Sequence, residues 1–266
     1  ESDINSITLP GAMAAFDSLN SKFGKLGLAE VCAKAIYYAE KGVVVSPRVA
    51  FDCSYSSSHL KGVAKDFYLK QGKPLRVGDV FYAPGQAKVL KEFAKNGAAG
   101  FYEGEVAKDL IGSLQNLGGV HTFEDLKNVE VEYVDPITLG LGDFELIEMP
   151  PNCQGVTALL IRKILEQFDL AKLDPTGAER VHLEAEAVKL AYGVRNKLIG
   201  DPKFYEFNIE DFISHEIVSN LAGRINLGLS LNQDSKTSES NHKDTVYLTV
   251  VDKDRCMVSL IFSIFN

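Results

Sequence analysis

The spacing of apolar residues predicts a helix-rich chain up to about residue 231. Apolar side chains recur every three or four positions there, which is the period of an α-helix with one buried face. Gly42 and the pair Gly118-Gly119 follow such segments and are expected to end helices. The segment 178–198 has apolar residues on two sides, which predicts a largely buried helix. The predicted helices are two within 11–45, then 86–95, 104–117, 156–168 and 178–198.

Alternation of apolar and polar residues predicts β-strands in two regions. Short alternating segments at 129–134, 137–141 and 144–149 are separated by turn-forming Asp-Pro and Gly-Asp pairs, so antiparallel strands are expected there. The runs 246–251 and 256–265 flank a charged turn at 252–255, which predicts a hairpin. Helices and antiparallel strands in separate regions indicate the α+β class.

The segment 232–244 separates these two parts of the chain. Its thirteen residues include no apolar side chain, so it is expected to be a mobile polar linker. The predicted organisation is a helix-rich core at 1–231, the linker at 232–244 and strands from 245 to 266. The chain starts at Glu1 rather than at Met and stops at Asn266 within an apolar run, so we expect the polypeptide to continue at both ends.

Composition narrows the classes of partner. The chain has 266 residues, is 45% hydrophobic and has a mean hydropathy of -0.02, which is typical of a soluble globular protein. Its net charge of -8 repels phosphate backbones and anionic lipid, so neither nucleic acid nor a membrane is expected as a partner. Apolar runs stay short of the roughly 20 residues of a membrane span. Cytoplasmic and exported locations both stay open.

Asp244-Thr245 is the strongest candidate for chemistry. A polar linker that leads into a Thr at the start of a strand is typical of enzymes that cut their own chain before a catalytic Thr. The Thr hydroxyl attacks the preceding carbonyl, and water hydrolyses the resulting ester. The freed α-amine, with a reference pKa of about 7.7–8.0, is then a base beside its own hydroxyl. Thr is also an ordinary strand residue, and this structural interpretation stays open.

The predicted hairpin relates Thr245 to a second hydroxyl. A tight turn centred between Lys253 and Asp254 pairs residues whose numbers add up to 507 or 508. Thr245 then lies opposite Phe262 or Ser263. In the second register the Ser263 hydroxyl is expected to orient the hydroxyl of Thr245.

Cysteines and histidines have structural interpretations. Cys153 has no indicated His or Asn partner, and a free Cys is commonly a small buried residue. The four cysteines are widely spaced, which argues against a zinc knuckle or a dense disulfide framework. Metal-ligand spacing is absent from the histidines, which are His59, His121, His182, His215 and His242.

Other polar motifs are also expected to be structural. The pairs Glu103 with Glu105 and Glu184 with Glu186 are two residues apart, so they do not face each other on a helix. Helix capping and exposed salt bridges account for them. The Gly-rich region 97–104 lacks the Lys-Ser/Thr ending of a phosphate loop, and 54–58 is expected to be a polar loop.

A set of short motifs, in order along nearly the whole chain, resembles the γ-glutamyltranspeptidase family of N-terminal-nucleophile hydrolases. The resemblance implies an αββα four-layer sandwich, of which this chain is a fragment, and self-cleavage into a large and a small subunit before Thr245. It also implies Thr245 as nucleophile, Ser263 as the supporting hydroxyl, no metal or organic cofactor, and a small γ-glutamyl or acyl-amide substrate such as glutathione. The motifs are TLPGAM at 8–13, FGKL at 23–26, AAGFYEG at 98–104, GG at 118–119, DL at 125–126, PPNCQG at 150–155, Glu184-Ala185 through Lys189, Arg195, Asp201-Pro202 and DTVYLTVVD at 244–252.

Four positions depart from the family pattern. Val246 and Tyr247 replace the usual Thr or Ala and His, and Arg255 replaces a Gly in the turn. Phe265 stands where the transpeptidases carry an Asn that holds the glutamyl group, and an apolar ring cannot replace its hydrogen bonds. The interpretations that stay open are a γ-glutamyl hydrolase or acyltransferase, an acylase of the same fold with a non-glutamyl substrate, and a non-catalytic scaffold. After cleavage, the large and small subunits of the protein are expected to be each other's partners, and a homo-oligomer stays open.

Overall fold

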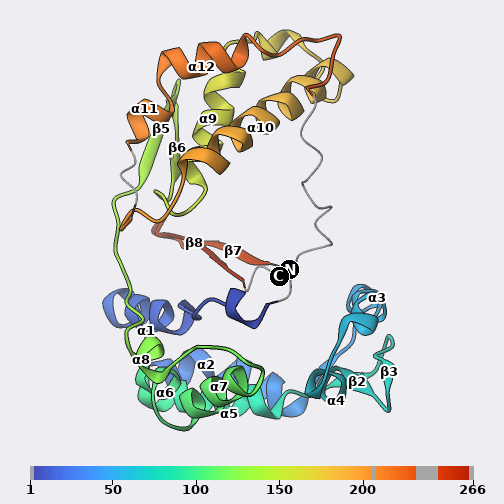
Figure 1. Cartoon of the computed structure of the whole chain (residues 1–266). Helices are drawn as coiled ribbons and strands as arrows, with labels where there is room; N and C mark the ends of the chain where they lie inside the picture. The colour runs from blue at the N-terminus through green and yellow to red at the C-terminus, as the bar shows by residue number, and fades with distance from the viewer. Residues whose placement is uncertain (1–2, 205–207, 232–244, 264–266) are drawn as a thin grey trace. The chain divides into compact units, whose positions relative to one another are not determined.

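The computed structural model describes residues 3–204, 208–231 and 245–263. The chain divides into two compact units, and each is described by itself below. Unit 1 comprises residues 1–131 and 243–266, and unit 2 comprises residues 132–242. The candidate nucleophile Thr245 belongs to unit 1, together with the N-terminal helices (Figure 1).

Unit 1 is mainly helical. Its helices α2 and α5 pack side by side, and the short strand β1 pairs antiparallel with β4. Gly42 ends α2 at a φ of 86°, where a Cβ atom would come within 2.4 Å of Val80 Cγ1, so only glycine fits this turn. The elements are η1 (Ile4–Ser6), α1 (Ala12–Phe23), α2 (Leu28–Lys41), β1 (Val43–Val44), α3 (Pro47–Ser56), η2 (Ser57–His59), α4 (Val63–Tyr68), β2 (Leu69–Lys70), β3 (Lys73–Pro74), β4 (Val80–Phe81), α5 (Pro84–Asn96), α6 (Ala99–Tyr102), α7 (Gly104–Asn116), α8 (Phe123–Lys127), β7 (Val246–Val251) and β8 (Met257–Phe262).

A small core fixes the start of α1 against α6. The buried Tyr102 hydroxyl donates to Pro10 O at 2.6 Å and accepts from the Ala14 N–H at 3.2 Å. The Asp17 carboxylate accepts from the Ala98 N–H at 2.8 Å. These hydrogen bonds satisfy buried polar groups of both segments, so they fix the position of α1 relative to α6. The buried cluster consists of Ala14, Tyr102, Ala107, Ile111 and Leu126.

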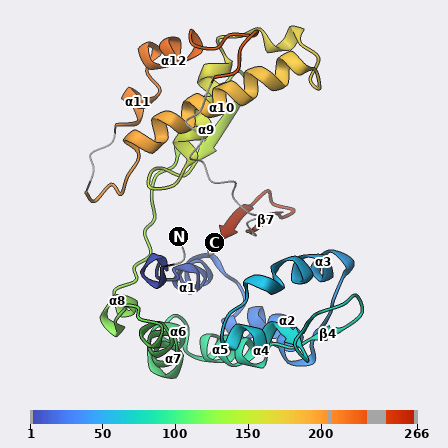
Figure 2. The ribbon, with the colours of Figure 1, turned by 45° about the vertical axis from the view of Figure 1, so that its right-hand side comes forward.

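Unit 2 is a β-hairpin packed on helices. Strand β5 lies against α9, and α9 also contacts α10 and α12 (Figures 1 and 2). Leu159, Leu160 and Ile164 of α9 are fully buried, and this continuous apolar stripe explains why the helix forms the centre of the core. The elements are β5 (Ile137–Leu141), β6 (Phe144–Glu148), α9 (Gly155–Leu165), η3 (Leu170–Lys172), α10 (Ala178–Leu198), α11 (Ile209–Phe212) and α12 (His215–Ala222).

Most predicted elements are confirmed, with three corrections. Residues 129–134 form no strand, because no other described segment pairs with them. Helix α10 buries one face only: Leu183 and Ala187 are buried, whereas Val181 of the second apolar face is 55% exposed. The predicted polar loop at 54–58 is helical, since it lies within α3 and η2.

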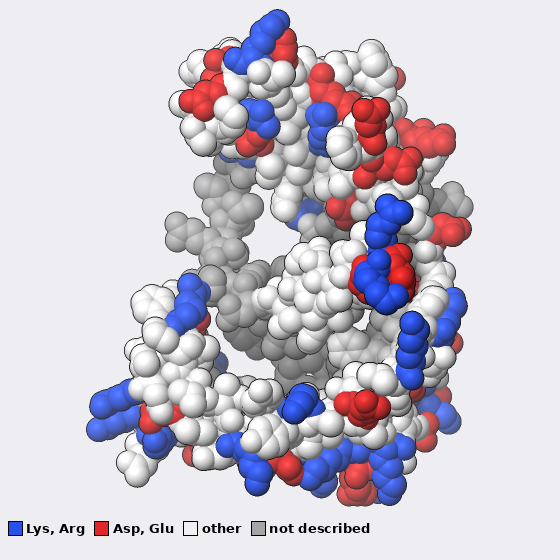
Figure 3. Space-filling model, turned by 180° about the vertical axis from the view of Figure 1, so that it is seen from behind, with Lys and Arg blue, Asp and Glu red and all other residues white. Residues whose placement is uncertain are grey.

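The described strands form four two-stranded antiparallel sheets, so the α+β class is confirmed. Within the ranges described, helices are either too short or too polar to cross a membrane. Basic and acidic side chains are interspersed on the face shown in Figure 3. The predicted linker 232–244 lies outside the described residues.

Candidate active site

The hairpin of β7 and β8 positions the candidate nucleophile. Its paired residues run from Val246 with Phe262 to Val251 with Met257, and the numbers of each pair add up to 508. Of the two registers that the sequence leaves open, the hairpin has the one that favours Ser263. Continuing it by one residue brings Ser263 opposite Thr245, which directly precedes β7.

The turn that sets this register is one residue longer than a two-residue turn. The Asp252 N–H donates to Cys256 O at 3.0 Å, which leaves three residues, 253–255, in the loop. The Asp252 carboxylate accepts from the Asp254 N–H at 2.9 Å and from the Cys256 N–H at 2.8 Å. Arg255 adopts a φ of 62°, a left-handed conformation that closes such loops and that glycine adopts more easily. The loop is therefore centred on Asp254, half a residue beyond the centre between Lys253 and Asp254 that the sequence predicted.

The two faces of the hairpin differ in chemistry. Side chains alternate along a strand, so residues of one parity share a face with their cross-strand partners. The face of Val246 is entirely apolar, and its Phe262 ring meets the Phe16 ring of α1 edge-on at 5.4 Å. The opposite face, called here the hydroxyl face, contains Thr245, Tyr247, Thr249, Ser259 and Ser263.

The hydroxyl face holds a candidate acylation centre and a second, separate hydroxyl pair. The Tyr247 hydroxyl bonds the Ser259 hydroxyl at 3.1 Å. Ser259 pairs with Thr249, which is four positions along the strand from Thr245 and two beyond Tyr247, so Tyr247 leans away from the candidate nucleophile. Thr245 and Ser263 are exposed in the structure, while Asp244 lies outside the described residues.

Two surface cavities lie elsewhere. One of about 490 Å³ is lined by residues of unit 2, including Arg162 and Arg180. The other, of about 630 Å³, is lined by residues between α3 and β3, including Lys65 and Asp66. Neither includes a residue of β7 or β8. The hairpin thus presents the hydroxyls, and neither cavity supplies a substrate pocket beside them.

Cys153 lies at the surface, and two of the histidines make structural contacts. Cys153 is exposed rather than buried, and its N–H donates to Pro150 O at 3.1 Å within a turn. Among the described residues, groups of three His, Cys, Asp or Glu side chains that could hold a metal ion are absent. His121 bonds Ile7 O at 2.7 Å and His182 bonds Asn226 O at 3.0 Å, so both tie down neighbouring chain. His242 lies outside the described residues.

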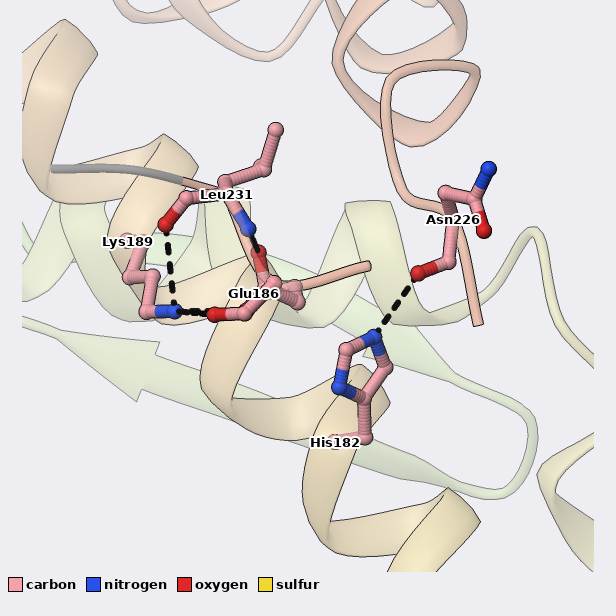
Figure 4. Close-up of polar contacts among 6 residues, drawn as sticks. His182, Glu186, Lys189, Asn226 and Leu231 are labelled. Atoms are coloured by element: carbon pink, nitrogen blue, oxygen red, sulfur yellow. Dashed lines mark hydrogen bonds and ion pairs between the residues drawn. The ribbon is translucent and has the colours of Figure 1, made fainter. Parts of the chain in front are cut away.

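Among the four glutamates of the pairs 103/105 and 184/186, one has a role that was not predicted from the sequence. Glu105 and Glu184 form the expected surface salt bridges, with Lys108 and Arg180. Glu186, in contrast, is 1% exposed and lies in a polar cluster on α10 (Figure 4). The sequence signal that could have revealed its burial is its position among Leu183, Ala187 and Leu190, on the apolar stripe of the helix.

The environment of Glu186 keeps it ionised. Burial raises the pKa of its carboxyl, but hydrogen bonds from Lys189, the Leu231 N–H and Ser230, with the charge of Lys189, outweigh this effect and hold the pKa below its usual value of 4.5. The buried Glu186 and the half-buried Lys189 consequently form an ion pair near neutral pH.

Comparison with known proteins reveals clear relatives. The model of a protein family described as gamma-glutamyltranspeptidase matches residues 1–266. The chain is 30% identical over 266 residues to the glutathione hydrolase-like YwrD proenzyme of Bacillus subtilis, covering 98% of this chain and 49% of that protein. The chain spans about half the length of the curated relatives it matches.

Solved structures share the fold. Helicobacter pylori gamma-glutamyltranspeptidase matches with a TM-score of 0.78 at 25% identity, over 89% of this chain and 72% of that one. Cephalosporin acylase from Bacillus halodurans matches with a TM-score of 0.77 at 30% identity, over 84% of this chain and 43% of that one. These neighbours have the N-terminal-nucleophile hydrolase fold, so the predicted fold, a fragment of the αββα sandwich, is confirmed.

Proposed function

The chain belongs to the γ-glutamyltranspeptidase family, and from this membership we propose that it is part of a self-cleaving N-terminal-threonine hydrolase or acyltransferase. In this proposal Thr245 is the nucleophile of both the cut and the later catalysis. The observation that supports it most is the position of Thr245 directly before β7, with Ser263 next in register on the partner strand.

The proposed cut occurs between Asp244 and Thr245. The Thr245 hydroxyl attacks the carbonyl carbon of residue 244, the C–N bond breaks, and the acyl group passes to oxygen as an ester. The broken C–N bond leaves the α-amine of Thr245 free, and water then hydrolyses the ester, which frees the α-carboxyl group of Asp244 and the hydroxyl of Thr245. The chain up to residue 244 then belongs to the large subunit, with a core at 1–231 followed by 232–244, and the chain from residue 245 on belongs to the small subunit.

Catalysis would use the groups that the cut creates. The α-amine of Thr245 accepts the hydroxyl proton as the oxygen attacks the carbonyl carbon of an amide substrate. The amine product leaves with a proton, and an ester remains on Thr245. Water or an acceptor amine then attacks this ester and releases the acyl group. Ser263 orients the Thr245 hydroxyl through a hydrogen bond across the hairpin. No step of this sequence draws on a metal ion or organic cofactor.

The proposed substrate is a small molecule with an acyl-amide bond, and a γ-glutamyl amide such as glutathione is our first choice. This choice is supported by the relatives named glutathione hydrolase proenzymes. The alternative is an acylase with a non-glutamyl substrate, which is favoured by Phe265 in the sequence and by the similarity to cephalosporin acylase.

A panel of chromogenic anilides tests the choice. The processed full-length protein is incubated with γ-glutamyl anilide and with anilides of apolar acyl groups, and kcat/KM is measured for each. A preference for the γ-glutamyl compound is expected. Faster hydrolysis of the apolar compounds would reject glutamyl specificity and favour the acylase, and Phe265→Asn would then shift the preference back toward glutamyl.

A non-catalytic scaffold is the second candidate function. Val246, Tyr247 and Phe265, which depart from the family pattern, favour it. A scaffold hydrolyses none of the anilides and stays one chain on a denaturing gel. Hydrolysis that is lost in Thr245→Ala would exclude this candidate.

A further inference from the structure

A row of polar residues on α10 holds the chain that leads toward Thr245. His182, Glu186 and Lys189 are spaced by four and three positions, so they lie on one side of the helix (Figure 4). They bond residues between 226 and 231, which come immediately before the segment 232–244. One helix face therefore fixes the last described stretch of the large-subunit core.

Glu186 is the centre of this row. Its carboxylate accepts from the Lys189 ammonium at 2.6 Å, from the Ser230 hydroxyl at 3.0 Å and from the Leu231 N–H at 2.9 Å. An ionised carboxylate that is 1% exposed is costly unless its hydrogen bonds are made. The docking of residues 230 and 231 provides two of these three bonds, so the carboxylate and the segment stabilise each other.

Lys189 completes the contact from the other side. Besides Glu186, its ammonium donates to the Ser230 hydroxyl at 2.6 Å and to Leu231 O at 3.4 Å. The Ser230 hydroxyl and both backbone polar groups of Leu231 are thus bonded by two side chains of α10. We call this pair of side chains, Glu186 and Lys189, the α10 anchor.

The position of the α10 anchor in the sequence gives it a specific consequence. Thirteen residues, 232–244, separate Leu231 from Thr245. In the uncut chain, residues 230 and 231 are held from both directions along the backbone. After a cut before Thr245 the downstream connection is lost, so the docking of these residues depends more on the α10 anchor.

We propose that Glu186 and Lys189 are positioning residues that keep the C-terminal end of the large-subunit core docked on α10, and that this docking becomes essential once the chain is cut. The second part rests on the proposed self-cleavage, while the first part does not. Loss of the anchor would lengthen the chain between the last docked residue and Thr245 from 13 to 22 residues, counted from the end of α12 at Ala222. Loop-closure entropy then predicts only about a two-fold change in the cleavage rate.

Hydrogen exchange of peptides covering 224–231, measured by mass spectrometry, tests the anchor in the full-length protein. Glu186→Gln removes the charge that pairs with Lys189 but preserves the size of the side chain. We expect the exchange rate of this segment to rise by about ten-fold or more. Loss of a hydrogen bond to a charged group changes the equilibrium constant for opening by about one to two powers of ten. The matched control is Glu184→Gln on the same helix, whose carboxylate pairs with Arg180 at the surface, and it should change exchange less than about two-fold.

The uncut Thr245→Ala chain separates the two parts of the proposal. Glu186→Gln should release 224–231 more strongly in the processed protein than in the Thr245→Ala background. An equal release in both would overturn the post-cleavage role. If the wild-type protein stays uncut, self-cleavage is wrong, yet the exchange of the uncut chain still decides whether the anchor exists.

A double variant guards against general unfolding. Glu186→Met with Lys189→Met removes the buried carboxylate together with its half-buried partner charge, and apolar replacement of such a pair is often tolerated by the core. We expect α9 peptides to stay protected while 224–231 exchanges rapidly. Protection of 224–231 in this variant, or in Glu186→Gln, would overturn the anchor.

Discussion

Removing the Ser263 hydroxyl should slow self-cleavage without stopping it. The hairpin register brings Ser263 opposite Thr245, and cross-strand partners have Cβ atoms about 4.5–5.5 Å apart, which lets two hydroxyls bond. A hydrogen bond between uncharged groups is worth about 0.5–1.5 kcal/mol. At about 1.36 kcal/mol per factor of ten, Ser263→Ala is expected to slow the cut by about 2- to 13-fold.

The assay follows conversion of the purified full-length precursor into two fragments on denaturing gels over time. Ser263→Thr restores a hydroxyl and should cleave at close to the wild-type rate. Ser259→Ala is the matched control, because Ser259 lies on the same strand and face but bonds Tyr247 instead. A wild-type rate for Ser263→Ala, or an equal loss in Ser259→Ala, would refute the assigned pairing.

Three further predictions concern stability. Phe212→Ala should destabilise unit 2 by about 3–5 kcal/mol in chemical denaturation, because Phe212 is 1% exposed, whereas Phe204→Ala at an 88% exposed position should change little. Arg255→Gly should raise the stability by up to about 1 kcal/mol, since it relieves a left-handed residue at φ 62°, and Lys253→Gly in the same turn should not; a lower melting temperature for Arg255→Gly would contradict this. Folding lowers the pKa of Glu186, so its stabilisation is present above its usual pKa of 4.5 and is lost as the pH falls through the lower folded value; Glu186→Gln should therefore lose less stability between pH 7 and pH 3 than wild type does, and parallel pH profiles would oppose this reasoning.

The sequence predicted those features that depend on local pattern. Helix α10 runs from Ala178 to Leu198, as its apolar period indicates, and Gly42 ends α2. The hairpin register was predicted to within one residue, because charged turn residues separate two alternating runs. Local periodicity and turn chemistry suffice for such elements.

Features that depend on distant partners were missed. Residues 129–134 alternate like a strand, but a strand forms only where another segment supplies its hydrogen bonds. Helix α3 was missed for a different reason, because its start signals are local. The Ser46 hydroxyl caps the Val49 N–H and Pro47 occupies the first turn, but the serine-rich stretch that follows suggested a loop.

The role of Glu186 was missed because it depends on distant partners, as the pairing of a strand does. Its acceptor function depends on Ser230 and Leu231, which lie more than forty positions later in the chain. A charged residue on an apolar stripe was the one local sign that a distant partner exists.

Accurate mass measurement of the fragments of the purified full-length protein tests the proposed self-cleavage most directly. The account predicts two chains, the second of which begins at Thr245, and a single uncut chain in Thr245→Ala. An intact wild-type chain, a cut at another bond, or a cut that persists in Thr245→Ala would contradict it.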